Sequence, residues 1–343
     1  MTVTALAMLA LLQASPIHPT AAQWGEHLLV ADGDGTVRAW TSKTLAFDAA
    51  RTKQLNGDGL LAIVANGDVL WGFDGTRAFT WDDAGARWDL VQSKPPRSAC
   101  TAFAVVDGAP VGTCGPGVHR FTDGRYWEAP AYKDQIEGRG FGDAPKAIGS
   151  HGTQLAIGTG FGEWGGHLWL LDVATGQWAK YYDELGGAVG LAWTGAGWAV
   201  AWSMSHFTAL ARLRVHGADG KPLKQGKELR DKYLRKLAFD DEAKVLLGLE
   251  QNTLVRIDDD LRLTNVQDVG KVKYGPERHA VGVSPGIGAL LALRSRGERG
   301  VVDPSLAGRV LVVPIAGEPL VVGAGKVTPL RTPAVDAGAP AKK

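Results

Sequence analysis

Short apolar segments alternate with glycine-containing turns along nearly the whole chain. The 46 glycines and 17 prolines are spread out rather than clustered, and they place a turn signal at about every ten residues, a spacing typical of short strands. No window carries the sustained period of an amphipathic helix. The pattern therefore predicts an all-β protein made of many short strands.

One unit, an apolar strand followed by a turn and a second apolar strand, recurs seven times. Its equivalent positions lie 41 to 46 residues apart, which is the length of one propeller blade. They are Leu28, Val69, Val111, Leu155, Ala199, Val245 and Leu291. We therefore expect a seven-bladed β-propeller of four-stranded antiparallel blades.

The two recurring strands are the middle pair of each expected blade, and one further strand precedes and another follows them. Residues 188–193 and 234–239 are examples of the preceding strand, and residues 87–92 and 177–182 of the following one. We letter the four strands A to D from the central channel outward. Stacking blades around an axis buries the two apolar faces of each blade, and aromatic side chains fill the gaps between blades. Most of the 12 tryptophans are expected in this core rather than stacked on sugars or bases: Trp40, Trp71, Trp81, Trp88, Trp169, Trp178 and Trp193.

Two kinds of repeat are recognisable in these segments. DGTVRAW from Asp34 and DGTRAFTW from Asp74 resemble the end of a WD40-type repeat, and LWLLDVATGQW from Leu168 resembles a quinoprotein-type repeat. The first resemblance implies a scaffold for protein partners, although the Gly-His and Trp-Asp dipeptides of WD40 repeats are mostly absent. The second implies a redox cofactor, eight blades and adjacent cysteines, none of which the sequence offers. The motifs thus specify the propeller class and no particular family.

The N-terminal segment has the features of a signal peptide. Its apolar run, residues 5–12, is too short to span a bilayer, and small residues and a proline follow it. No lysine or arginine precedes the run, so a mis-assigned start or a buried N-terminal strand is the alternative. We expect residues 1–14 to be removed, residues 17–330 to form one propeller domain and residues 331–343 to be disordered. The protein is then periplasmic or extracellular, with no membrane span.

Closure of the ring depends on where the signal peptide ends. Cleavage after residue 14 leaves residues 17–23 as strand A of the first blade. Cleavage after residue 22 requires that strand to come from elsewhere, and residues 325–330 are the candidate.

The two cysteines flank the hairpin signal Asp107-Gly108. Folding the chain about this turn brings Cys100 and Cys114 nearly opposite each other. A disulfide here closes a loop of about 15 residues and contributes roughly 3 kcal/mol in the loop-entropy model. Two reduced core thiols are the alternative.

Charge argues against nucleic acid as a partner, because the net charge is +1 and no global field favours phosphate. Locally, residues 212–236 are rich in lysine and arginine, and residues 240–260 are rich in acids. Solvated strand faces on neighbouring blades explain both segments, and a docking patch for an anionic partner is the alternative.

One face of the ring is the expected site of function. It carries the B–C and D–A connections, and three of its B–C connections, residues 159–166, 203–207 and 294–308, are predicted to be longer than tight turns. Together with the D–A connections they gather arginines, histidines, acids and aromatics. The candidates for binding are Glu163, Trp164, Arg139, Arg235, Arg278 and Arg296, near Phe141, Asp143, Tyr233, Tyr274 and Glu277.

Arginine and aromatic side chains suit carboxylates, phosphates or a protein partner. The sequence therefore favours a non-catalytic binding scaffold that engages a protein partner or an anionic ligand, with no cofactor. Glu163 and Trp164 lie in a glycine-rich connection that exposes them, unless the segment is a wide bulge whose Trp packs on the next blade.

The alternative is a propeller-type lyase or lactone hydrolase with a divalent metal in the channel. Glu163, His206 and His279 are its acid and base candidates. No nucleophile elbow, zinc helix or phosphate loop is present, and the acidic turns at residues 32–34 and 258–260 are typical of turns rather than of calcium sites.

Overall fold

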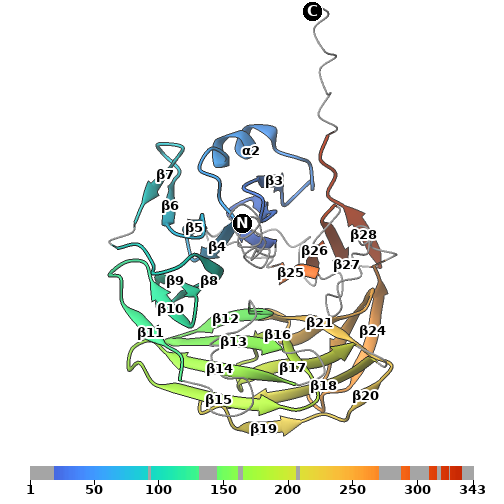
Figure 1. Ribbon diagram of the computed structural model, residues 1–343. Coiled ribbons are helices and arrows are strands. Elements are labelled where there is room, and N and C mark those ends of the chain that lie inside the picture. The colour runs from blue at the N-terminus through green and yellow to red at the C-terminus, as the bar shows by residue number, and fades with distance from the viewer. Residues whose placement is uncertain are drawn as a thin grey trace, which may run out of the picture.

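The computed structural model describes the chain in nine segments: residues 19–91, 94–130, 145–160, 165–205, 209–269, 287–293, 309–314, 318–323 and 325–333. In these segments seven antiparallel sheets follow one another around a common axis (Figure 1). Each sheet places its first strand nearest the axis and adds the next strands outward in chain order. The chain is a seven-bladed β-propeller, as the 41- to 46-residue repeat predicts.

The strands of the seven blades, in chain order, have the following bounds. Blade one contains β1 (Thr20–Trp24), β2 (His27–Ala31) and β3 (Val37–Thr41); blade two β4 (Ala62–Asn66), β5 (Val69–Phe73), β6 (Ala78–Asp82) and β7 (Arg87–Leu90); blade three β8 (Cys100–Val106), β9 (Ala109–Cys114), β10 (Gly117–Arg120) and β11 (Tyr126–Glu128); blade four β12 (Ala147–His151), β13 (Gln154–Gly160), β14 (Gly166–Asp172) and β15 (Trp178–Asp183); blade five β16 (Gly187–Trp193), β17 (Trp198–Ser205), β18 (Ala209–His216), β19 (Pro222–Gln225) and β20 (Leu229–Arg230); blade six β21 (Leu234–Asp240), β22 (Val245–Glu250), β23 (Thr253–Ile257) and β24 (Leu263–Asp268); blade seven β25 (Ile287–Ala292), β26 (Val310–Pro314), β27 (Leu320–Gly323) and β28 (Lys326–Pro329).

Blade five departs from the expected four strands, because its outermost strand is divided into two pieces. Strand β19 pairs with one end of β18 and β20 with the other. The interruption falls at Gly226, whose backbone N–H still donates to the carbonyl of Leu213 in β18.

Blade one departs further, because a helix replaces most of its fourth strand. Helix α2 (Ala49–Leu55) begins at Asp48, whose side chain accepts a hydrogen bond from the backbone N–H of Arg51, a typical N-cap. Side chains of the helix region then pair with the open edge of β3: Asn56 bonds both backbone groups of Val37, and Thr52 accepts from the N–H of Ala39. These polar side chains satisfy an edge that a strand satisfies elsewhere. The hydrophobic pattern did not predict this helix, because it is too short to show a period.

The apolar core consists of seven clusters, one between each pair of neighbouring blades, in the part of the chain described. The cluster between blades seven and one includes Leu28 and Val30 from β2 with Leu311 and Val313 from β26. All seven tryptophans expected in the inter-blade core belong to these clusters or pack against them. Burial of both faces of every blade thus closes the ring.

The ring closes with β1 as the inner strand of blade one, the arrangement expected for residues 17–23. Residues 326–329, the alternative inner strand, instead form β28 at the outer edge of blade seven. Ordered contacts continue just beyond it, because the carbonyl of Arg331 accepts from the indole N–H of Trp40 at 3.3 Å. The first residues of the tail therefore lie against blade one.

Six of the seven equivalent positions lie on the second strand of their blade, and the seventh does not. Leu291 is on β25, the inner strand of blade seven, so the expectation for this blade was wrong by one strand. The inner strand of blade seven is a continuous apolar segment. The first and second strands of a blade both have this pattern, so the sequence does not distinguish them.

Cys100 and Cys114 form a disulfide, as the hairpin register predicts. The two residues are directly paired between β8 and β9, with their Cα atoms 4.0 Å apart.

Candidate functional site

The two faces of the ring differ in their connections. We call the face with the A–B and C–D connections the turn face, and the face with the B–C and D–A connections the loop face. Except for residues 293–309 in blade seven, the turn-face connections are tight, such as residues 107–108 between β8 and β9. The loop face carries the long connections at residues 91–99, 129–146 and 269–286. Loops on a rigid scaffold are where binding residues gather.

The second and third strands of blades four and five are longer than those of other blades. Strands β17 and β18 have 8 residues each and β13 and β14 have 7 each, whereas their equivalents in blades one and two have 5. The inner strands do not match this length: β16 pairs with β17 only as far as Ser203, and β12 with β13 only as far as Gly158. Two neighbouring hairpins therefore extend past their inner strands on the loop face.

This result narrows the two connections expected at residues 159–166 and 203–207. Strands take up residues 159–160, 166 and 203–205, so the connections themselves are residues 161–165 and 206–208. Glycines allow the two blades to meet closely at this point. A Cβ atom on Gly160 would lie 2.6 Å from the Cα of Gly187, and one on Gly158 would lie 2.3 Å from the carbonyl oxygen of Ala188. The hairpin of blade four thus packs backbone to backbone on the inner strand of blade five.

Arg235 is the one predicted binding residue within the described part of the chain, and it lies beside the hairpin of blade five. The guanidinium stands 5.4 Å from the ring centroid of Tyr233, a cation–π distance. Burial raises the pKa of Tyr233, and the Arg235 charge opposes that rise. The backbone is fixed to the hairpin, because the N–H of Asp231 donates to Ala209 and the Ser203 hydroxyl donates to the carbonyl of Leu234. The structure thus brings Arg235 and Tyr233 together with this hairpin, and their role in binding stays a prediction.

The other predicted site residues lie outside the described residues: Arg139, Glu163, Trp164, His206, Arg278, His279 and Arg296. The order of the described strands still shows which strands a connection joins. Residues 294–308 join β25 to β26, the first and second strands of blade seven, rather than a second strand to a third. The expected B–C connection of blade seven is thus an A–B connection, and the placement of Arg296 beside Glu163 and Trp164 stays a prediction.

A buried charge cluster lies between blades four and five at the loop face, and sequence reasoning missed it. The carboxylate of Asp183, 2% exposed, accepts from Arg214 and lies 3.8 Å from Arg212. Arg214 also donates to the hydroxyl of Tyr181 at 2.5 Å and to Gln225 at 2.9 Å. The available signal was the i, i+2 spacing of the two arginines, which places both side chains on one face of β18.

Most charges of the basic segment are neutralised within the molecule. Six of its nine cations lie within 4.0 Å of a carboxylate: Arg212, Arg214, Lys221, Lys224, Arg230 and Lys232. Lys224 and Lys232 pair with Asp260 and Glu250 of the neighbouring acidic segment. The two segments thus partly neutralise each other across adjacent blades, and the exposed pairs leave little net field for an anionic polymer.

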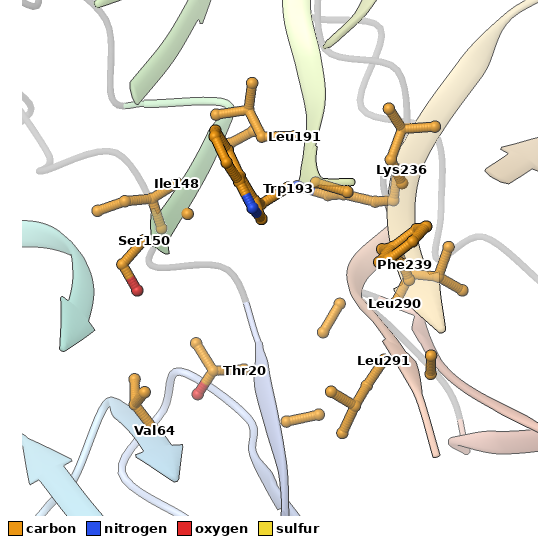
Figure 2. Close-up of a pocket in the computed structure, with 18 of the residues that line it drawn as sticks. Thr20, Val64, Ile148, Ser150, Leu191, Trp193, Lys236, Phe239, Leu290 and Leu291 are labelled. Carbon is orange, nitrogen blue, oxygen red and sulfur yellow. The ribbon is translucent and has the colours of Figure 1, made fainter. Parts of the chain in front are cut away.

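A central channel of about 760 Å³ runs through the ring. The inner strands of all seven blades line it, mostly with small and apolar side chains (Figure 2). In the close-up, Ile148 and Ser150 stand on one side of the opening and Lys236, Phe239 and Leu290 on the other, with Trp193 between them. The volume is that of a pocket for a small molecule.

Two lysines lie where the channel meets the loop face. Lys146 directly precedes β12 and Lys236 is near the start of β21. The Lys236 ammonium donates to the backbone carbonyl of Lys146 at 2.8 Å, so this side chain reaches from blade six past blade five to blade four. Burial and the positive charge of Lys146 lower the pKa of Lys236 to about 8. Sequence reasoning placed Lys236 on an inner strand but did not select it; a lysine on such a strand was the available signal.

Comparisons with known proteins agree on the fold and on nothing narrower. No protein-family model and no curated protein matches the chain. Among solved structures, the extracellular domain of a one-component system from B. thetaiotaomicron is similar, with a TM-score of 0.51 and 11% identity over 88% of this chain. The chain spans only 38% of that protein's chain. A chain in a crystal structure of the mitotic checkpoint complex is also similar, with a TM-score of 0.54 and 10% identity, covering 87% of this chain and 83% of that one.

The described residues contain neither a membrane-spanning helix nor a cluster of metal-ligating side chains. No helix there is long and apolar enough to cross a membrane. No group of three or more histidine, cysteine or acidic side chains there is arranged to hold a metal ion.

Proposed function

We propose that this chain is a non-catalytic binding scaffold, and that it engages a protein partner through the loop face at blades four to six. The observation that carries the proposal is the pair of neighbouring hairpins that extend past their inner strands, β13–β14 and β17–β18. The five other blades have second strands that end level with the inner strand. Extra length at one sector of one face is unnecessary for closing the ring, which makes this sector a candidate for recognition.

The side chains beside these hairpins have the chemistry of a protein contact. Tyr233 and Arg235 form a cation–π pair there, and Arg230 is well exposed on the adjoining edge strand β20. Tyrosine and arginine are enriched among residues that dominate binding energy. A protein is favoured over an anionic polymer because six cations of this region already have carboxylate neighbours.

We further propose that the scaffold works in the periplasm or outside the cell. The disulfide between Cys100 and Cys114 is typical of an oxidising compartment, and the apolar run at residues 5–12 supports export. Strand β1 includes Ala22, so a mature chain beginning after residue 22 would lose most of that strand. Cleavage after residue 14 is therefore the proposed site.

A matched pair of double variants tests the partner-binding face. Arg230→Glu with Arg235→Glu reverses two charges on the loop face, and Arg262→Glu with Lys326→Glu does the same at two exposed residues of the turn face. Each protein is immobilised, and retained proteins from an extract of the source cell envelope are quantified. We expect the loop-face variant to lose a partner that wild type and the turn-face variant retain. Equal retention by both variants, with both folded by circular dichroism, would refute the assignment.

A further inference from the structure

Among the described residues, the channel mouth at the loop face carries two lysines without a carboxylate partner. Lys146 and Lys236 lie close enough for the charge of one to affect the other, and no carboxylate among the described residues lies within ion-pair distance of either. Asp241 lines the same channel, but it is five residues further along the chain, roughly 17 Å in a strand. Two neighbouring cations without a carboxylate are unfavourable unless an anion joins them.

Below the lysines the channel wall changes to apolar and aromatic side chains. Ile148, Leu191, Trp193, Phe239 and Leu291 line this part (Figure 2). Trp193 is held in place by stacking on His151, with ring centroids 4.1 Å apart, and by an edge contact to Trp198. The wall is therefore preformed and apolar, with polar groups gathered at one end, which is the usual design of a small-molecule site.

A hydrogen bond fixes the position of the Lys236 side chain, and its ammonium group keeps further N–H donors for a ligand. One hydrogen of its ammonium group is used in the bond to the Lys146 carbonyl, and an ammonium group has three. The side chain therefore crosses the mouth of the channel in a defined place while two N–H groups remain for a ligand.

We propose that the channel binds an amphipathic anion, a carboxylate with an unbranched or aromatic apolar body, whose head group lies between Lys146 and Lys236 and whose body lies against Trp193 and Phe239. The ligand enters from the loop face. This small-molecule site is separate from the partner-binding hairpins, so it stands or fails independently of the proposed function.

The test uses three probes of equal chain length and different head group: octanoate, octanol and octylammonium. Isothermal titration calorimetry measures their binding to the full chain at pH 7. We expect octanoate to bind at least about tenfold more tightly than octanol, because charge-assisted hydrogen bonds add to apolar contact. Octylammonium is expected not to bind. Equal affinities for the three probes, or no octanoate binding at 10 mM, would overturn the proposal.

Three single variants locate the head group. Lys236→Met and Lys146→Met remove one charge each at nearly constant side-chain length, and we expect each to weaken octanoate binding at least about tenfold. Lys244→Met is the matched control, because Lys244 lines the channel at its other end beside Asp241, and it should leave the affinity unchanged. Retained affinity in both mouth variants, or an equal loss in the control, would contradict the proposal. If Lys236→Met fails to fold, Lys146→Met decides alone.

A spectroscopic readout separates ligand binding from a purely structural role of the lysine. A bound carboxylate replaces like-charge repulsion by attraction, so it should raise the pKa of Lys236 from about 8 toward the ordinary value of a lysine. Titration of the 15N-labelled ammonium by NMR, with and without octanoate, measures the change. An unchanged pKa at saturating octanoate would place the ligand elsewhere.

Discussion

The turn face and the loop face of the ring are built from the same strands but under different constraints. On the turn face, residues such as Gly67, Gly108 and Gly152 have positive φ values of 61°, 72° and 54°, and these backbones reverse the chain in two residues. On the loop face, hairpins of unequal length, the long connections and the disulfide of blade three vary from blade to blade. The turn-face connections resemble one another because a tight turn requires one backbone geometry. The loop-face connections lack that constraint, so their sequences can vary.

The largest expected difference between the faces concerns buried charge. Asp183→Ala on the loop face leaves Arg212 and Arg214 without their shared buried carboxylate and should destabilise the fold by about 3–5 kcal/mol. Asp219→Ala on the turn face removes an exposed partner of Lys221 and should leave stability unchanged. Urea unfolding measures both. Similar midpoints for the two variants would mean that the Asp183 cluster is not a buried structural network.

The disulfide, which joins two strand ends at the loop face, gives the next-largest expected loss of stability. The Cys100→Ala, Cys114→Ala double variant should lose about 3 kcal/mol, since the loop that the bond closes becomes free in the unfolded chain. Wild type in dithiothreitol should unfold at the same urea concentration as the double variant. A reduced wild type as stable as the oxidised protein would show that the bond adds nothing.

Acid should weaken the protein through His167 at the loop-face end of β14. Burial, with a smaller contribution from the Lys180 charge, lowers its pKa to about 4, against 6.5 in the unfolded chain. Between these values the unfolded state binds the extra proton, so the stability that His167 contributes above pH 6.5 is lost as the pH falls to about 4. Wild type should lose about 2–3 kcal/mol more than His167→Phe between pH 7 and pH 4. Parallel stability curves in urea would contradict this assignment.

The smallest expected difference compares one glycine from each face. Gly187→Ala places a Cβ atom 2.9 Å from the Cα of Gly160 in the next blade, and because that neighbour is backbone we expect a loss of about 2 kcal/mol. Gly108→Ala meets nothing within 4 Å but keeps a φ of +72°, which costs about 1 kcal/mol. Thermal unfolding of both variants shows which of them loses more stability. A larger effect at Gly108 would show that blades four and five do not meet closely.

The sequence predicted the repeated part of this molecule well. Period-2 strands, turns such as Asp107-Gly108 and a repeat of about 44 residues specify the ring because every blade must bury two apolar faces. The disulfide followed from the same hairpin register. These features are local, so they can be read without knowledge of distant contacts.

The parts that escaped prediction depend on distant or irregular contacts. Helix α2 replaces a strand through the side chains of Thr52 and Asn56, and Leu291 lies on an inner strand that its apolar pattern does not distinguish from a second strand. The pairing of Lys236 with Lys146 joins residues 90 positions apart. Of the predicted binding residues, Arg235 lies at the extended hairpins, and the others lie outside the described residues.

Site-specific photocrosslinking tests most directly whether the loop face at blades four to six binds the partner. A benzophenone amino acid replaces Tyr233 on the loop face in one protein and Arg262 on the turn face in another, and each is irradiated in the cell envelope of the source organism. We expect a discrete crosslinked protein with the probe at position 233 and none at position 262. A partner captured at position 262, and not at 233, would contradict it.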